Sequence, residues 1–115
     1  MDITETFQLF LPTEWLEFFD LTNIIEKPYG WEITLTEKPD LIPRSLKNKI
    51  AVLNGYLNPI EINDFPIRGK PTFLKFIRRR WKEEGSQESH FNTYQFHPEG
   101  MKATKEFGAF LKEFD

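Results

Sequence analysis

The chain has 115 residues, no cysteine and a net charge of −3. This length suffices for one domain with a single core, which we expect over residues 1–115, and the lack of thiols excludes disulfides and thiolate metal sites. The N-terminus has no basic flank before an apolar core, and no apolar run approaches the roughly 18 residues of a membrane-spanning helix. We therefore expect a cytoplasmic protein with no membrane partner.

The first 19 residues have the apolar spacing of helices. Intervals of three and four separate the apolar residues Phe7, Phe10, Leu11, Trp15 and Phe18. A proline at position 12 interrupts this pattern, and proline is well tolerated only in the first turn of a helix. The sequence therefore predicts two short helices, at about residues 3–10 and 12–19.

Strand signals dominate the middle of the chain. A hairpin is expected at residues 23–38, where PYG separates two β-rich runs and apolar residues 31, 33 and 35 alternate with polar ones. Residues 39–49 indicate a loop, with one helical turn near residues 44–48. Further strand candidates are IAVL, PIEIND, TFLKFIRRRWK and HFNTYQF, separated by the turn sequences NGYLN, RGKP and EEGSQES.

The last segment, GMKATKEFGAFLKEF, predicts an amphipathic helix. Its apolar residues Phe107, Phe110, Leu111 and Phe114 fall on one helix face. The expected fold class is therefore α+β: two short N-terminal helices, a mainly antiparallel sheet with a basic hairpin, and a C-terminal amphipathic helix.

Positive charge is concentrated in residues 64–82. This segment holds seven bases against one acid, whereas residues 1–63 hold ten acids and five bases. Salt screens charges beyond about 10 Å, so local charge matters more than the total. The candidate DNA-binding residues are Arg68, Lys70, Lys75, Arg78, Arg79, Arg80 and Lys82. Composition alone favours a solvated, edge-protecting strand over a phosphate-binding one, because most charge runs are solvated.

Alternation along this strand gives neither face a purely apolar character. Phe73, Ile77 and Trp81 share one face with Lys75 and Arg79, while Leu74 and Phe76 share the other with Arg78 and Arg80. We expect the first half of the strand to be buried and the three arginines to emerge at the rim. The seven bases would then form one outward-facing cationic ridge, and the turn around Gly69 would allow close approach to a phosphate.

Catalytic and metal chemistry find no support in the sequence. Without cysteine, His90 and His97 would need two carboxylates for a zinc site, so surface or half-buried histidines are expected. Asp64 has no evident catalytic partners and is expected to accept hydrogen bonds at the turn. We therefore predict a non-catalytic chain without cofactors. Single-strand binding, with Tyr94 and Phe96 stacking on bases, is a third possibility.

Two blocks of sequence resemble a known bacterial family. These are residues 64–70 (DFPIRGK), leading into a strand that ends in RRRW, and residues 104–113 (TKEFGAFLKE). They are similar to the separately encoded N-terminal region of ISAon-type insertion-sequence transposases, and residues 11–20 add a weaker similarity. The resemblance implies DNA binding at the element's terminal inverted repeats through the basic hairpin. Catalysis would come from a separately encoded DDE-type transposase subunit.

A protein-interaction module is the main alternative. Such a module would dock on the catalytic transposase subunit and regulate it without touching DNA. The acidic front half and the C-terminal helix both suit a partner surface.

Overall fold

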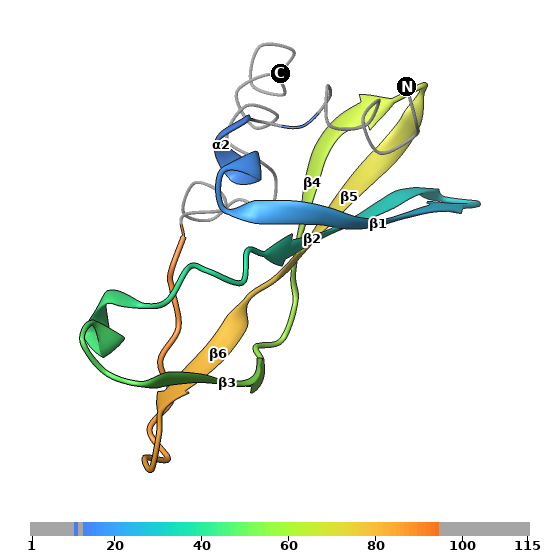
Figure 1. Cartoon of the computed structure of the whole chain (residues 1–115). Coiled ribbons are helices and arrows are strands. Elements are labelled where there is room, and N and C mark those ends of the chain that lie inside the picture. Colours follow the sequence, from blue (N-terminus) through green and yellow to red (C-terminus); the bar gives the residue numbers. More distant parts are fainter. Residues whose placement is uncertain (1–10, 12, 95–115) are drawn as a thin grey trace, which may run out of the picture.

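Two β-sheets make up most of the part of the chain that the structure describes, which is residue 11 and residues 13–94 (Figure 1). In this computed structural model, a four-stranded sheet has the order β1-β2-β5-β4, and a ribbon pairs β3 with β6. The elements are α2 (Thr13–Leu16), β1 (Phe19–Lys27), β2 (Gly30–Glu37), the 3-10 helix η1 (Arg44–Leu46), β3 (Ala51–Tyr56), β4 (Ile60–Ile67), β5 (Lys70–Ile77) and β6 (Arg79–Glu83). Within these residues, no helix has the length and apolar character needed to cross a membrane.

The four-stranded sheet consists of two hairpins side by side. β1 and β2 are antiparallel around residues 28–29, β4 and β5 are antiparallel around residues 68–69, and β2 and β5 pair in parallel. Both turns therefore lie at the same end of the sheet. Gly30 is needed where the hairpins meet, because a Cβ atom there would lie 2.3 Å from the carbonyl oxygen of Pro71.

One face of this sheet forms the main core. Alternation along β2 buries Trp31, Ile33, Leu35 and Glu37. The ring of Phe76 in β5 lies 5.1 Å from the rings of both Trp15 and Phe19, so α2 and the start of β1 cover this face. The other buried apolar residues of the core are Leu11, Ile62, Ile67 and Leu74.

The β3–β6 ribbon extends from the end of the sheet opposite the hairpin turns (Figure 1). β6 continues the line of β5 after a one-residue break at Arg78. The ribbon has a β-bulge between Leu53 and Tyr56. Trp81 is buried outside the main core cluster, and it exchanges two backbone hydrogen bonds of 2.7 Å with His90.

The break between β5 and β6 lies beside Glu37, the last residue of β2. Pairing of β2 with β5 ends at Thr36 and Ile77. The backbone N–H of Arg79 then donates to Glu37 Oε1 at 2.9 Å, and Arg79 Nε donates to the Glu37 carbonyl oxygen at 2.9 Å. A side-chain carboxylate thus satisfies a backbone donor that a continuing strand would have paired.

The predicted α+β fold class is wrong for the described residues, which are mainly strand. Only Thr13–Leu16 of the predicted helix at 12–19 is helical, and Phe19 begins β1. Burial of the Phe19 ring in the sheet core overrides the helical spacing of the residues before it. The predicted helix at 3–10 and the predicted C-terminal helix both lie outside the described residues.

Several local predictions are confirmed and three are corrected. The hairpin at residues 28–30, the helical turn at η1 and the RGKP turn are present. TFLKFIRRRWK forms two strands in different sheets, and residues 54–56 of NGYLN belong to β3. HFNTYQF is not a strand, because His90 forms an isolated bridge and residues 91–94 are irregular; residues 95–96 lie outside the described part.

Candidate nucleic-acid interface

Charge separates along the molecule. We define the sheet lobe as residues 13–37 and 59–77, which include β1, β2, β4 and β5, and the ribbon lobe as residues 38–58 and 78–94, which include η1, β3 and β6. The sheet lobe holds eight acids and four bases, a balance of −4, and the ribbon lobe holds eight bases and four acids, a balance of +4. The bases of the ribbon lobe are Lys38, Arg44, Lys47, Lys49, Arg78, Arg79, Arg80 and Lys82.

The bases of the ribbon lobe have no direct ion-pair partners among residues 13–94. Within the described part of the chain, none of them forms an ion pair with a carboxylate. Arg44, Lys47 and Lys49 are exposed, and the other five are partly buried. The ribbon lobe therefore carries a net positive charge whose bases have no direct ion-pair partner among the described residues.

The structure divides the seven predicted residues between the two lobes. Arg78, Arg79, Arg80 and Lys82 lie in the ribbon lobe, whereas Arg68, Lys70 and Lys75 lie in the acidic sheet lobe. The seven do not form one ridge, because the chain passes from one sheet to another between Ile77 and Arg79.

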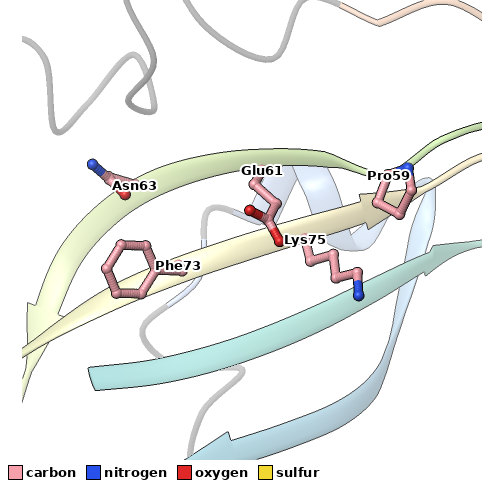
Figure 2. Close-up of a pocket in the computed structure, with 5 residues that line it drawn as sticks. All are labelled: Pro59, Glu61, Asn63, Phe73 and Lys75. Carbon is pink, nitrogen blue, oxygen red and sulfur yellow. The ribbon is translucent and has the colours of Figure 1, made fainter. Parts of the chain in front are cut away.

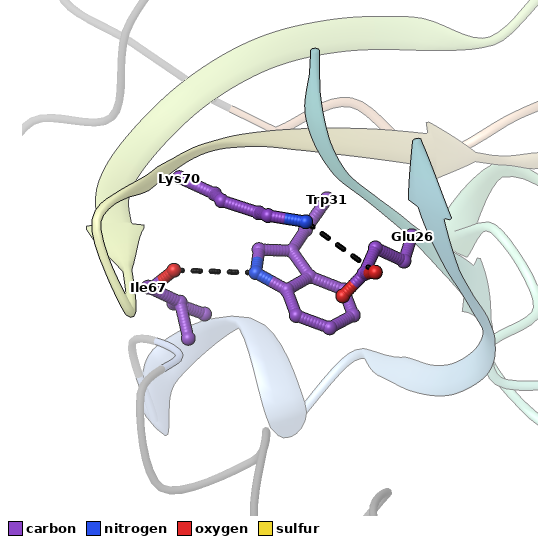
Figure 3. Close-up of polar contacts among 4 residues, drawn as sticks. All are labelled: Glu26, Trp31, Ile67 and Lys70. Atoms are coloured by element: carbon purple, nitrogen blue, oxygen red, sulfur yellow. Dashed lines mark hydrogen bonds and ion pairs between the residues drawn. The ribbon is translucent and has the colours of Figure 1, made fainter. Parts of the chain in front are cut away.

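Lys70 forms an ion pair and a cation–π contact within the sheet lobe (Figure 3). Its Nζ lies 3.4 Å from Glu26 Oε1 and 5.6 Å from the centre of the Trp31 ring. Trp31 Nε1 in turn donates to the carbonyl oxygen of Ile67 at 3.2 Å. These contacts join the two hairpins, so Lys70 has a structural partner for its charge.

Lys75 lies on the face of the sheet opposite the core. It lines an open pocket with Pro59, Glu61, Asn63 and Phe73 (Figure 2). Glu61 is its direct cross-strand neighbour on β4. Lys75 is thus set beside an acid, while Arg68 is exposed at the hairpin turn with a positive φ of 53°.

Arg78 and Arg79 bind parts of the fold. Arg78 Nη1 donates to the carbonyl oxygen of Asn92 at 3.3 Å, and its guanidinium carbon lies 5.5 Å from the Phe91 ring centre. Arg79 binds Glu37 as described above. Its Nη1 also donates to Tyr56 Oη at 3.4 Å, and its guanidinium carbon lies 5.6 Å from the centre of the Tyr56 ring. Arg79 thus joins the two lobes, while the Arg78 contacts lie within the ribbon lobe.

Glu37 is the centre of this junction. Its fully buried carboxylate also accepts hydrogen bonds from Asn92 Nδ2 at 3.1 Å and from Tyr94 Oη. Burial and then the hydrogen bond to Glu37 raise the pKa of Tyr94, and Arg78 lowers it in part. The Tyr94 ring packs 5.1 Å from Phe19, so it is tied to the fold rather than presented for base stacking; Phe96, the second stacking candidate, lies outside the described residues.

The exposed face of the ribbon carries Arg80 and Lys82. Strand alternation places these two side chains on one face of β6, together with Val52, the cross-strand neighbour of Lys82. Arg79 and the buried Trp81 point to the opposite face. Val52 is 39 % exposed, and on the opposite face Leu53 is 43 % and Tyr56 50 % exposed. Solvent therefore reaches both faces of the ribbon, and the partly buried Arg80 and Lys82 are accessible on theirs.

Sequence reasoning missed Arg44, Lys47 and Lys49. The signal was present as a second basic run, RSLKNK, but 28 residues separate it from RRRWK in sequence. Topology brings the two runs together: the N–H of Glu84 donates to the carbonyl oxygen of Ile50 at 2.9 Å, and Ser45 Oγ hydrogen-bonds His90 Nδ1 at 2.7 Å.

Neither a metal site nor a known relative indicates a further function for the described residues. Among residues 13–94, no group of three or more His, Asp or Glu is placed to hold a metal ion, and Asp64 is buried in β4. No family model, curated protein or solved structure matches the chain. The resemblance to ISAon-type transposase N-terminal regions therefore stays a prediction from the residues quoted above.

Proposed function

We propose that this protein is a non-catalytic module that binds double-stranded DNA through the ribbon lobe. The observation that carries the proposal is the balance of +4 on that lobe, without internal ion pairs, in a chain whose net charge is −3. Lysine and arginine contacts to phosphates release condensed counterions, which is the main source of affinity for a duplex.

The shape of the lobe supports the same function. A two-stranded ribbon is narrow enough to enter the major groove of B-form DNA. The exposed face of β6 offers Arg80 and Lys82, and the segment before β3 offers Arg44, Lys47 and Lys49. Arg44, Lys47 and Lys49 would contact the phosphate backbone while the ribbon lies in or along the groove.

The identity of the DNA rests on the sequence resemblance. We take the terminal inverted repeats of an insertion sequence as the target and the separately encoded DDE-type transposase as the catalytic partner, in the cytoplasm. Residues 64–81 and 104–113 support this part of the proposal, independently of the charge on the lobes.

A titration of labelled duplex over a range of salt concentrations tests the proposal. About four phosphate contacts predict a slope near −4 in a plot of log affinity against log salt concentration. The duplexes are the terminal inverted repeat of the neighbouring element and a scrambled sequence of the same length. Affinity that does not change with salt would refute phosphate binding.

Paired charge reversals locate the interface. The ribbon variant Lys47→Glu with Lys49→Glu and the control variant Arg68→Glu with Lys75→Glu change the net charge equally, but in different lobes. We expect a large loss of affinity in the first and a small one in the second. A loss confined to the control would move the interface to the β4–β5 hairpin, and equal losses would mean that only net charge matters.

The exposed apolar side chains of the ribbon favour a second candidate function, docking on the catalytic subunit. Ile50 is 66 % exposed, Leu53 43 % and Tyr56 50 %, all in or next to β3. An apolar edge strand is a template for pairing with another chain. The neutral variant Leu53→Gln separates the two functions: it would weaken capture of the catalytic subunit under the docking hypothesis and leave the salt slope for DNA unchanged.

A further inference from the structure

The three consecutive arginines use their donors differently. Arg78 and Arg79 each engage a terminal nitrogen, on the Asn92 carbonyl and the Tyr56 hydroxyl respectively. In the part of the chain that the structure describes, Arg80 is held only through Nε, which donates to the carbonyl oxygen of Asn54 at 2.7 Å. Within the described residues, Nη1 and Nη2 of Arg80 therefore keep their N–H groups available.

A glycine in β3 makes room for this guanidinium. Gly55 lies in the β-bulge between Leu53 and Tyr56, with φ at +81°. A Cβ atom on Gly55 would lie 3.2 Å from Arg80 Nη2, closer than an ordinary van der Waals contact. The guanidinium thus lies against bare backbone, and the Asn54 carbonyl anchors it at Nε.

The held guanidinium belongs to a partly exposed side chain on a face of the ribbon that solvent reaches. Arg80 shares its face of β6 with Lys82, and the cross-strand neighbour Val52 on that face is exposed. An arginine fixed at Nε presents Nη1 and Nη2 as a fork for two acceptors in one plane. Less side-chain entropy is lost on binding when such a fork is already ordered.

We propose that Arg80 is a pre-organised fork that binds a planar pair of acceptor atoms on duplex DNA, either two oxygens of one phosphate or O6 and N7 of a guanine. This inference rests on the proposed function and names the residue that would make its most directional contact. Lys82, next on the same face, supplies a second positive charge beside the fork.

The test compares Arg80→Lys with Arg44→Lys in duplex titrations. Both variants keep the positive charge, but only Arg80→Lys removes a guanidinium that is anchored by a hydrogen bond to the fold. We expect Arg80→Lys to lower affinity about tenfold, as for loss of a bidentate contact, and Arg44→Lys to change it less than about twofold. Thermal unfolding of both variants checks that the fold is retained.

Gly55→Ala provides an independent variant that leaves Arg80 in place. The added methyl group shifts the fork and also strains the backbone at φ +81°, which thermal unfolding of the variant measures; if the fork binds DNA, affinity should fall in the wild-type background and should not fall further in the Arg80→Lys background. Equal affinity of wild type and Arg80→Lys would overturn the fork. If Lys47→Glu with Lys49→Glu still weakens binding in that case, the ribbon interface itself survives.

A duplex containing 7-deazaguanine identifies the acceptor. It lacks N7 and keeps every phosphate. If the wild type binds the 7-deazaguanine duplex more weakly than the ordinary duplex, and Arg80→Lys binds both equally, the fork is assigned to guanine. Equal binding of both duplexes by the wild type, together with the loss in Arg80→Lys, would assign the fork to a phosphate.

Discussion

Replacing Glu37 with glutamine tests whether a buried carboxylate holds the two lobes together. The two carboxylate oxygens accept hydrogen bonds from the backbone N–H of Arg79, from Nδ2 of Asn92 and from Oη of Tyr94. Glutamine has nearly the same shape but only one acceptor oxygen. If that oxygen faces Asn92 and Tyr94, the Arg79 N–H meets an amide NH2 group and loses its acceptor.

The size of the effect follows from these three bonds. A buried donor left without its acceptor costs about 1–3 kcal/mol, and each bond that changes from a charged to a neutral acceptor loses about 1 kcal/mol. The lower desolvation cost of a neutral amide offsets part of this. We expect a net loss of about 2 kcal/mol, which lowers the unfolding midpoint by about 10 °C in a domain of this size.

Thermal and urea unfolding, followed by circular dichroism, measure this change. Glu32→Gln is the matched control, because Glu32 lies on the open face of β2 and its hydrogen bond, from Tyr29 Oη, is exposed. We expect the control to stay within about 0.5 kcal/mol of the wild type. A Glu37→Gln midpoint equal to that of the wild type would refute the reasoning, since it would mean that the carboxylate does not hold the two lobes together.

Three further predictions test the core and the junction. Gly30→Ala should destabilise by about 3 kcal/mol in urea, because its Cβ would meet the Pro71 carbonyl oxygen, whereas Gly69→Ala, with no atom within 4 Å, should cost only about 1 kcal/mol of backbone strain. Phe76→Ala should cost about 3–5 kcal/mol and Phe73→Ala, on the other face, clearly less; equal losses would contradict the face assignment. The raised pKa of Tyr94 predicts that stability falls as pH rises above about 10, where the unfolded chain releases a proton that the folded chain retains; Tyr94→Phe should remove this part of the fall in a pH series of unfolding curves.

The hairpins could be predicted because their signals are local. The turn at residues 28–29 and the alternation from Trp31 to Leu35 lie within one short window, and the structure buries the residues that this pattern marks. Phe19 was misassigned for the opposite reason. Its place in β1 depends on pairing with Glu37 and on the Phe76 ring, both far away in sequence.

The candidate site was predicted only in part. The basic run at residues 78–82 is visible in the sequence, but its separation from Lys70 and Lys75 depends on the break at Arg78. No residue between Thr72 and Lys82 signals that break. It follows from the Glu37 carboxylate, which captures the Arg79 N–H across 42 positions of sequence.

The break also changes how the arginine run can be tested. Reversing the charge of Arg78, Arg79 and Arg80 together would remove the Arg79 side-chain bonds to the Glu37 carbonyl oxygen and to Tyr56 as well as the guanidinium of Arg80. The junction would lose stability, and any loss of DNA binding would then have two causes. Alternation along β6 separates them, because Arg79 lies with Trp81 on one face, where it binds Glu37 and Tyr56, and Arg80 lies with Lys82 on the other. Arg79→Lys should therefore lower the unfolding midpoint, and Arg80→Lys should lower affinity at a nearly unchanged midpoint; the reverse result would exchange the roles of the two residues.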